Sequence, residues 1–362
     1  MKVHVLRSDI LEAMQRVQYS ASGKGIMPIL SGVKIDCSDG AMELSATDLE
    51  SYTVTGCEAN VEETGACVVN MKTFLEYLRG SGDERLAMEC TANELKVQGE
   101  KSTVRLYVMP VEDFPARPEV DIPVLEEMQA GEIFRAVSKV SRAASKDEKR
   151  PTLMGVYMEV AEGEVRLVST DSYRLAIEVL RGGFKVREEG DYIIPAASLV
   201  NLARAAGREG SLNIWREENR GQLRFDVDGI THMIRLIEGK FPKYGQFIPE
   251  ETNISIEADK KGLLDALKRI SLISSTVKIT AKEGVMLLEG ESREVGEGKE
   301  EVETVHTGEE INIAFNTTFL EDGIQSLEGE KVVLGLNEPL KPGVVKEKDG
   351  REFTYVIMPI RM

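Results

Sequence analysis

Three segments of this 362-residue sequence carry a basic side chain at the same place in a helical pattern. The segments align without gaps and are residues 10–22 (ILEAMQRVQYSAS), 133–145 (IFRAVSKVSRAAS) and 263–275 (LLDALKRISLISS). Each has apolar residues at the spacing of an amphipathic helix, as in Ile10 and Met14 of the first segment. The cations stand beside this apolar stripe at equivalent positions: Arg16, Lys139 and Arg269. Cations placed in this way can neutralise DNA phosphates without reading the bases, so the chemistry expected of them is charge pairing.

The residue types that support covalent catalysis are not arranged for it. The three histidines are scattered in the sequence, and no other metal-binding side chains stand near them at a ligand spacing: His4, His232 and His306. The four cysteines lie in the first third of the chain, without a CxxC motif: Cys37, Cys57, Cys67 and Cys90. Two disulfides could form among them, but a chain with this much core does not need them, and small buried strand residues are the favoured interpretation.

Two further motifs fail to indicate an active site. No Gly-rich phosphate loop of a standard form occurs, since Gly296 and Gly298 lie in a polar run without a strand-to-helix context. Two Thr-Asp pairs, at residues 47–48 and 170–171, recur where predicted hairpins end, and a turn role explains them better than a catalytic dyad. We therefore expect no metal, no cofactor and no enzymatic activity.

Each basic helix is followed by a strand pair and a second helix, so the chain is predicted to be a threefold repeat. The strand pairs occupy residues 33–48, 156–171 and 277–292, and alternating apolar residues flank a turn glycine in each. These glycines, Gly40, Gly163 and Gly284, are 123 and 121 residues apart. The second helices are predicted at residues 70–79, 195–206 and 316–327.

The repeat predicts an α+β fold of three tandem copies, each an antiparallel sheet with two helices on one face. The expected domains are residues 1–121, 122–248 and 249–362. Such copies leave sheet edges open, which invites pairing between neighbouring copies or between chains. A first copy that pairs with the third copy of another chain makes a head-to-tail contact, which closes into a ring if the rotation fits. The repeat alone leaves closure undecided.

The formal net charge of −17 is unusual for a protein that binds DNA. Residues 7–24, 132–150 and 259–275, which hold the first helices and their loops, carry thirteen basic and seven acidic side chains. The rest of the chain therefore carries −23. Helices often expose lysine and arginine, but recurrence in three copies favours one basic surface on an acidic body, which suits the phosphate backbone.

Composition indicates a soluble globular protein, with 42% hydrophobic and 30% charged residues. No apolar run approaches the roughly 18 residues needed to span a bilayer. Residues 1–11 carry charges where a signal peptide would need an uninterrupted apolar stretch. A cytoplasmic location is expected.

With these residues identified, the chain resembles the bacterial DNA sliding clamps, the β subunits of DNA polymerase III. The resemblance covers the full length and rests on these motifs: MPILSGVKI (27–35), SATDLE (45–50), DFPARP (113–118), RPTLMGV (150–156), STDSYRLA (169–176), KFPKYGQFIP (240–249), AFNTTFL (314–320) and YVIMPIRM (355–362). It implies a head-to-tail homodimer of three-domain chains, a ring whose helical inner wall surrounds duplex DNA. It also implies these DNA-binding residues: Arg16, Lys24, Lys139, Arg142, Lys146, Lys149, Arg150, Lys268 and Arg269.

The resemblance implies a second site, a hydrophobic pocket for short linear motifs of the replicative polymerase, the ATP-dependent clamp loader, other polymerases and repair proteins. Carried over by position, it consists of Leu153, Thr170, Ser172, Tyr173, Arg174, Leu175, Pro242, Gln246, Phe247, Val356, Ile357, Met358, Pro359, Ile360 and Arg361. Proline, methionine and aliphatic residues would form an adaptable apolar trough, and arginine would offer an orienting polar edge. Without the resemblance, the last residues would be interpreted as a simple C-terminal strand.

The sequence departs from the family pattern inside this pocket. Ser172 and Tyr173 stand where many members have Gly and His, and Gln246 stands where an Arg can occur. Phe247 is bulkier than the usual aliphatic residue. The shape of the pocket and its motif preference are therefore expected to differ.

The subunit interface is expected to join Val104 and Leu106 of one chain to Leu272 and Ile273 of the other. The acidic stretch 297–303 could pair there with Arg105 or Lys72, although such charge runs are more often simply solvated. Two alternatives to a clamp remain at this point. One is an enzyme on DNA or nucleotides with dispersed carboxylates, and the other is a protein scaffold that never encloses DNA.

Overall fold

The computed structural model describes residues 1–22, 27–38, 40–219, 221–348, 350 and 352–361. Within these residues the chain forms six α-helices and 26 strands, and it divides into two compact units. Unit 1 comprises Met1–Phe134, Gly183–Glu189 and Ala197–Leu236. Unit 2 comprises Arg135–Gly182, Gly190–Ala196 and Ile237–Met362.

Unit 1 is built on one sheet of 14 strands in the order β14-β10-β16-β17-β18-β4-β3-β2-β6-β9-β8-β7-β1-β5. Its strands are β1 (Lys2–Leu6), β2 (Gly32–Ser38), β3 (Ala41–Thr47), β4 (Ser51–Cys57), β5 (Ala59–Glu63), β6 (Gly65–Asn70), β7 (Arg85–Cys90), β8 (Glu94–Gln98), β9 (Thr103–Met109), β10 (Ile122–Gln129), β14 (Lys185–Val186), β16 (Ser211–Arg216), β17 (Gln222–Val227) and β18 (Ile230–Arg235). All neighbouring strands for which a register is defined run antiparallel, as the alternating patterns predicted.

Unit 2 is built on one sheet of 12 strands in the order β15-β11-β12-β13-β26-β25-β24-β19-β22-β21-β20-β23. Its strands are β11 (Gly155–Ala161), β12 (Glu164–Thr170), β13 (Arg174–Arg181), β15 (Gly190–Pro195), β19 (Ile254–Asp259), β20 (Thr276–Lys282), β21 (Val285–Ser292), β22 (Gly296–Thr307), β23 (Ile311–Asn316), β24 (Lys331–Leu336), β25 (Gly343–Glu347) and β26 (Phe353–Ile357).

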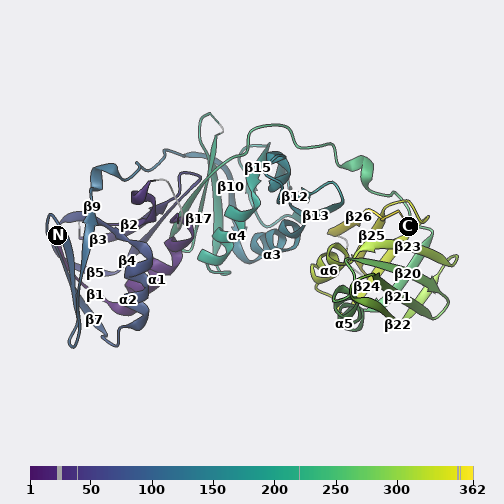
Figure 1. The fold of residues 1–362 in the computed structure, drawn as a ribbon. Coiled ribbons are helices and arrows are strands. Elements are labelled where there is room, and N and C mark those ends of the chain that lie inside the picture. Colours follow the sequence, from purple (N-terminus) through teal and green to yellow (C-terminus); the bar gives the residue numbers. More distant parts are fainter. Residues whose placement is uncertain (23–26, 39, 220, 349, 351, 362) are drawn as a thin grey trace. The chain divides into compact units, whose positions relative to one another are not determined.

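The helices are α1 (Arg7–Val17), α2 (Met71–Gly80), α3 (Ala130–Val140), α4 (Ala196–Ala205), α5 (Lys260–Ser271) and α6 (Thr317–Gln325). In unit 1, α1 and α2 lie side by side, and in unit 2, α5 and α6 do the same (Figure 1). Three of the helices begin at a side chain that caps a free backbone N–H: Asn70 accepts from Thr73, Asp259 from Gly262 and Asn316 from Phe319.

The threefold repeat is confirmed by the order of the elements. In each copy a first helix (α1, α3 or α5) precedes a hairpin (β2–β3, β11–β12 or β20–β21), and a second helix (α2, α4 or α6) follows. The three turn glycines have positive φ angles of +78° (Gly40), +74° (Gly163) and +80° (Gly284). A side chain with a Cβ is disfavoured in this left-handed region, which explains glycine at each turn.

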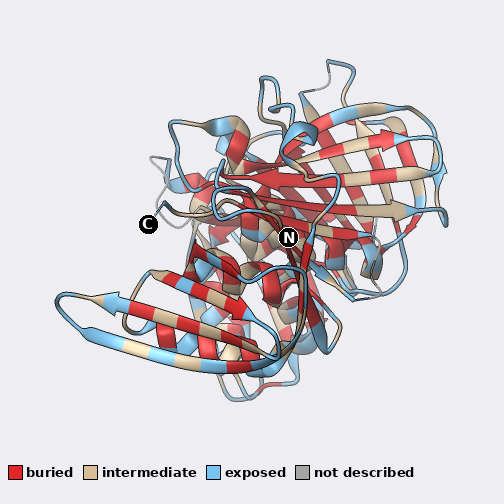
Figure 2. Ribbon diagram, turned by 90° about the vertical axis from the view of Figure 1, so that its right-hand side faces the viewer, coloured by how far each residue is buried: buried red, intermediate tan, exposed pale blue. Residues whose placement is uncertain are grey.

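Burial follows the apolar stripes of the helices and the inner faces of the strands (Figure 2). In unit 1, Ile10 and Met14 of α1 pack with Phe74 and Leu78 of α2, and all four are fully buried. Each such side chain contributes about 1.5–3 kcal/mol when it leaves water, so this stripe drives the helix onto the sheet. Among the described residues, no helix is long and apolar enough to cross a membrane.

The sheets continue from one repeat into the next. Strand β4 of the first copy pairs with β18 of the second, from Ser51 opposite Ile234 to Thr55 opposite Ile230. Strand β13 of the second copy pairs with β26 of the third in the same antiparallel manner. Edges that a single copy would leave open are thus covered by its neighbour in the chain, and this pairing divides the central copy between the two units.

Candidate binding pocket and basic residues

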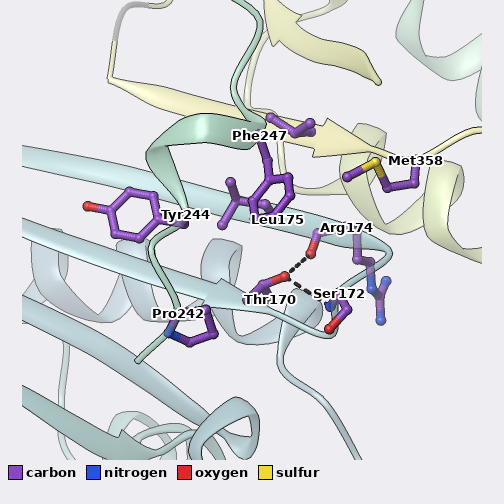
Figure 3. Close-up of a pocket in the computed structure, with 9 residues that line it drawn as sticks. Thr170, Ser172, Arg174, Leu175, Pro242, Tyr244, Phe247 and Met358 are labelled. Atoms are coloured by element: carbon purple, nitrogen blue, oxygen red, sulfur yellow. Dashed lines mark hydrogen bonds between the residues drawn. The ribbon is translucent and has the colours of Figure 1, made fainter. Parts of the chain in front are cut away.

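Unit 2 contains an apolar cavity of about 150 Å³ where β12, β13, β26 and the segment after β18 meet (Figure 3). Its lining residues are Thr170, Ser172, Arg174, Leu175, Pro242, Tyr244, Phe247, Val356 and Met358. Eight of these nine were predicted from the sequence, and Tyr244 was not. A concave apolar site with few polar groups is typical of ligand and peptide recognition.

Strand pairing brings the two halves of the cavity together. Leu175 of β13 lies opposite Val356 of β26, so their side chains share one face of the sheet. Beyond β26 the tail is held by its backbone: Met358 N–H donates to the carbonyl of Tyr173 at 2.8 Å, and Ile360 N–H donates to that of Ala314 at 2.7 Å. These bonds fix the direction of the tail and place Met358 at the cavity.

The turn from Thr170 to Arg174 forms the polar rim of the cavity. Thr170 Oγ1 donates to the carbonyl of Arg174 at 2.6 Å and accepts Ser172 N–H at 3.1 Å. Asp171 Oδ1 accepts the backbone N–H groups of Tyr173 and Arg174. Ser172 has a φ angle of +81°, a conformation that costs a serine more than it would cost a glycine. The predicted turn role of the Thr-Asp pair is therefore confirmed.

Tyr244 belongs to an aromatic cluster beside the cavity. The rings of Tyr157 and Phe241 are stacked with centroids 4.8 Å apart, and Tyr244 meets both edge-on. Its hydroxyl donates to Glu159 Oε2 at 2.5 Å, and burial together with this carboxylate raises the pKa of Tyr244. Tyr244 could have been included from the sequence, since it lies in the same motif between the predicted Pro242 and Phe247. No sequence pattern indicated which way its ring faces.

Arg174 lines the cavity, as predicted, but its guanidinium is engaged by groups of the protein. Its side chain is only 8% exposed, and its guanidinium is directed away from Phe247 and Leu175 (Figure 3). Nε donates to Asp171 Oδ2 at 2.9 Å, Nη1 donates to Asp322 Oδ2 at 2.5 Å, and the group lies 4.2 Å from the ring centre of Phe319. Two carboxylates therefore hold the guanidinium through Nε and Nη1, and these bonds fix its direction.

The other predicted pocket residues do not line this cavity. Leu153 and Ile357 are buried in the protein, and Pro359 and Ile360 are half-buried. Gln246 and Arg361 are exposed outside it. Tyr173 is 60% exposed next to the cavity, where its ring lies 6.4 Å from that of Phe319.

The cations of the first helices differ in environment, although they are equivalent in sequence. The ammonium of Lys139 lies 3.0 Å from Glu178 Oε1, and the two side chains are 12% and 6% exposed. Burial raises the pKa of Glu178, and the nearby ammonium opposes that shift. Lys139 is therefore chiefly half of a buried ion pair, and its expected role at DNA conflicts with this placement.

Arg16 and Arg269 are nearer to solvent but are also paired. Arg16 contacts Glu12 at 2.8 Å and Asp228 at 3.0 Å, whereas Arg269 holds Glu300 through two bonds of 2.7 Å. Such surface pairs contribute roughly 0–1 kcal/mol, so a phosphate can compete for these arginines. Whether these two arginines can bind DNA thus depends on competition between a phosphate and their carboxylate partners.

The remaining predicted cations lie after α3 and at the end of α5. Arg142, Arg150 and Lys268 are 41%, 40% and 58% exposed, and each lies within 4 Å of one carboxylate. Lys146 and Lys149 are exposed and form no ion pair within the described part of the chain. Lys24 lies outside the described residues.

The residues expected at the subunit interface show mixed exposure. Leu272 is 78% exposed, and Val104 and Ile273 are half-buried. Leu106 is 8% exposed and packs in the core of unit 1, so it supports β9 from within. Arg105, expected to meet acidic residues of another chain, lies 3.3 Å from Glu94 in its own.

The side chains that could support covalent or metal chemistry are dispersed over the described residues. In the described residues, no three His, Cys, Asp or Glu side chains gather closely enough to hold a metal ion. All four cysteines are free thiols; Cys37 and Cys67 are buried as expected, whereas Cys57 and Cys90 are only half-buried.

Three family models match successive parts of the chain. They describe the N-terminal, central and C-terminal domains of the DNA polymerase III beta subunit and match residues 1–118, 127–243 and 245–361. The chain belongs to the β sliding clamp family.

Full-length relatives agree with this assignment. The chain is 27% identical over 367 residues to the beta sliding clamp of Chlamydia pneumoniae, which covers all of this chain and 99% of that one. It is 28% identical over 376 residues to the beta sliding clamp of Streptomyces coelicolor, covering 100% of both. These relatives identify a processivity factor of DNA polymerase III, a non-catalytic subunit in DNA replication, which confirms that expectation.

Solved structures agree as well. The beta subunit from Thermotoga maritima matches with a TM-score of 0.92 and 25% identity, covering 100% of this chain and 99% of that one. The beta chain from Streptococcus pneumoniae TIGR4 matches with a TM-score of 0.93 and 26% identity over 100% of both chains. The predicted three-domain α+β clamp fold is therefore confirmed.

Proposed function

We propose that two copies of this chain form a head-to-tail ring that encircles duplex DNA and slides on it without sequence specificity. The full-length family match carries this proposal, because a sliding clamp must hold DNA while moving along it. Movement of that kind requires contacts with phosphates and not with base edges. The acidic remainder of the chain would discourage DNA from binding elsewhere.

The exposed cations are the residues we assign to DNA. Lys146 and Lys149 are free to approach a phosphate, and Arg142, Arg150 and Lys268 would exchange a carboxylate for one. Arg16 and Arg269 would add to this set at a larger cost, since Arg16 holds two carboxylates and Arg269 holds one through two bonds of 2.7 Å. Lys139 is the weakest member because its charge is neutralised inside the protein.

The cavity of unit 2 is the proposed docking site for partner motifs. Leu175, Val356 and Phe247 provide apolar walls, and Met358 provides a flexible one. A short linear motif with one or two large apolar side chains fits such a wall. The proposed partners are the catalytic subunit of the replicative polymerase, the ATP-dependent clamp loader, other polymerases and repair proteins.

Three finer proposals rest on the same family match. We propose domain boundaries at residues 1–121, 122–248 and 249–362, and a cytoplasmic location. The proposed subunit interface uses Leu272, Ile273 and Val104, with Leu106 as its support from the core.

Retention on DNA circles tests the ring directly. The clamp is loaded onto nicked circular DNA with ATP and the clamp loader of the same organism, and retention is measured by gel filtration. We expect stable retention on circles and rapid release once a restriction enzyme linearises the DNA. Equal loss from circular and linear DNA would contradict the ring. Docking is tested by anisotropy with a fluorescein-labelled peptide copied from the carboxyl-terminal tail of the same organism's polymerase III catalytic subunit.

A further inference from the structure

One carboxylate of α6 joins a proposed DNA cation to the proposed partner pocket. Asp322 Oδ2 accepts a hydrogen bond of 2.5 Å from Arg174, which belongs to the pocket turn. Its other oxygen, Oδ1, lies 3.5 Å from Nη1 of Arg142. Arg142 is 41% exposed at the end of the α3 region, whereas Arg174 is 8% exposed. A residue open to solvent and a residue behind the cavity thus share one negative charge.

These groups form a cluster with equal numbers of positive and negative charges. Arg142 and Arg174 supply two positive charges, and Asp322 and Asp171 supply two negative ones. The two contacts of Asp322 are unequal, since the one to Arg174 is 1.0 Å shorter. Arg142 has a second acceptor at 3.0 Å, Gln325 Oε1, which is neutral. Arg142 is therefore the member that can leave the cluster most readily.

The shared charge reaches the cavity through the turn. Arg174 Nε holds Asp171, and Asp171 in turn accepts the backbone N–H groups of Tyr173 and Arg174. Thr170 and Ser172 of the same turn line the cavity, and the carbonyl of Tyr173 anchors Met358. Any change in how firmly Asp322 holds Arg174 is passed to these lining residues by direct hydrogen bonds.

We propose that Asp322 is a positioning residue for the pocket, and that Arg142 weakens its grip until a DNA phosphate draws Arg142 away. DNA in the ring and a motif in the pocket then favour each other. The inference rests on the proposed function and deepens it, because it makes the partner affinity of the clamp depend on whether the clamp is loaded.

Elementary electrostatics predicts that motif binding tightens when Arg142 leaves the cluster. Two guanidinium groups on one carboxylate repel each other, and each reduces the attraction available to the other. When a phosphate takes Arg142, the ion pair between Arg174 and Asp322 strengthens, and the pocket turn becomes more rigid. A more rigid pocket loses less conformational freedom on binding, so the motif binds more tightly. By linkage, the bound motif must tighten the hold on DNA by the same factor.

The decisive variant is Arg142→Gln, measured without DNA. Removing the charge imitates the departure of Arg142, so the labelled polymerase-tail peptide should bind the full-length variant about fivefold more tightly than wild type, a modest coupling. A loss of basic charge that strengthens binding is not expected from a merely structural role. Unchanged or weaker binding by Arg142→Gln would overturn the proposal.

Lys146→Gln is the matched control. Lys146 is exposed in the loop that follows, carries the same charge and forms no ion pair in the described part of the chain. Its substitution should leave peptide affinity unchanged while lowering the affinity for DNA. If both variants tightened peptide binding equally, a general change of charge would be the cause, and the proposal would fail.

Two further measurements separate this inference from the proposed function. The wild-type clamp on nicked circular DNA should bind the peptide about fivefold more tightly than the free clamp, and Arg142→Gln should show no further gain. Asp322→Asn should bind weakly in both states, with partial rescue by Asp322→Glu and with folding checked by thermal melting. Peptide binding that is normal but indifferent to DNA would overturn the coupling alone. A wild-type clamp that bound no peptide at all would overturn the pocket itself.

Discussion

Thr53 Oγ1 and His232 Nδ1 lie 2.6 Å apart, although 179 residues separate them in the chain. They stand on the paired strands β4 and β18, directly opposite each other, where the first repeat joins the second. Ser20 continues the chain of polar groups, with its hydroxyl 2.6 Å from that of Thr53. All three are almost completely buried, so this junction contains a small polar network inside an apolar setting.

The buried imidazole predicts acid sensitivity. Burial lowers the pKa of His232 from its ordinary value of 6.5 to about 4. As the pH falls, the imidazole is therefore protonated first in the unfolded chain. The contribution of neutral His232 to the free energy of unfolding is complete above pH 6.5 and is lost as the pH falls towards 4. At about 1.4 kcal/mol per pKa unit, the loss over this window is on the order of 3 kcal/mol.

Chemical denaturation between pH 7 and pH 4.5 measures this loss. His232→Asn keeps a hydrogen-bonding side chain without the titration, so its free energy of unfolding should fall less steeply with acid than that of wild type. Parallel slopes for wild type and His232→Asn would contradict the assignment.

Lys139→Met should destabilise the protein by about 3–5 kcal/mol at neutral pH, because it leaves the carboxylate of Glu178 buried without its cation. The raised pKa of Glu178 should rise further in the variant, so protonation relieves the cost and the variant regains stability as the pH is lowered through that pKa. Urea unfolding at pH 7 and pH 5 measures both effects. The double variant Lys139→Met with Glu178→Gln should recover much of the loss; no recovery would mean that packing and not charge is responsible.

The contrast between Lys139 and its repeat partners shows what the sequence could and could not predict. The helical spacing and the gap-free alignment were sufficient for the threefold fold, because apolar periodicity decides which face of a helix is buried. The helices nevertheless begin at Arg7, Ala130 and Lys260, three residues before the aligned segments, since their first three residues include no large apolar side chain that would mark the stripe. Whether a cation meets water or a carboxylate depends on other strands, and Glu178 is 39 residues away.

The sequence predicted most residues of the pocket but not the directions of their side chains. Motif residues gave eight of the nine lining positions, yet the direction of the Arg174 side chain depends on Asp322, which is 148 residues away in the third repeat. Local sequence patterns carry no information about such a partner. The missed Tyr244 lines the cavity, but its ring packs edge-on against Tyr157 and Phe241, contacts that no local pattern indicates.

Removing the tail after Ile357 should abolish peptide binding while leaving the dimer intact. The deletion removes Met358 from the cavity and breaks the backbone bonds to Tyr173 and Ala314, but it leaves β26 paired with β13. Peptide anisotropy and sedimentation of the same sample measure the two properties. Met358→Leu is the matched control and should retain most of the affinity; a truncated chain that failed to fold would show that the tail is mainly structural.

Leu272→Asp should separate the subunits without unfolding them. Leu272 is 78% exposed just beyond α5, so a carboxylate there is solvated in the free chain but would be buried unpaired in the proposed interface. Sedimentation should give about twice the chain mass of 40.1 kDa for wild type and the single mass for the variant. Leu340→Asp, at a second exposed leucine of the same domain, should stay dimeric.

Gly323→Ala should destabilise the clamp, although alanine normally stabilises a helix by about 1 kcal/mol over glycine. Gly323 lies in α6, and a Cβ built on it would approach the ring of Tyr355 to 2.6 Å. Tyr355 is completely buried and bonded through its hydroxyl to the carbonyl of Phe319, so it cannot move aside cheaply. Overpacking of this kind costs typically 1–3 kcal/mol, which outweighs the helical gain. Thermal unfolding measures the net effect. Gly323→Ala should cost less stability in a Tyr355→Leu background than in wild type, whereas a single variant more stable than wild type would show that α6 can shift away from β26.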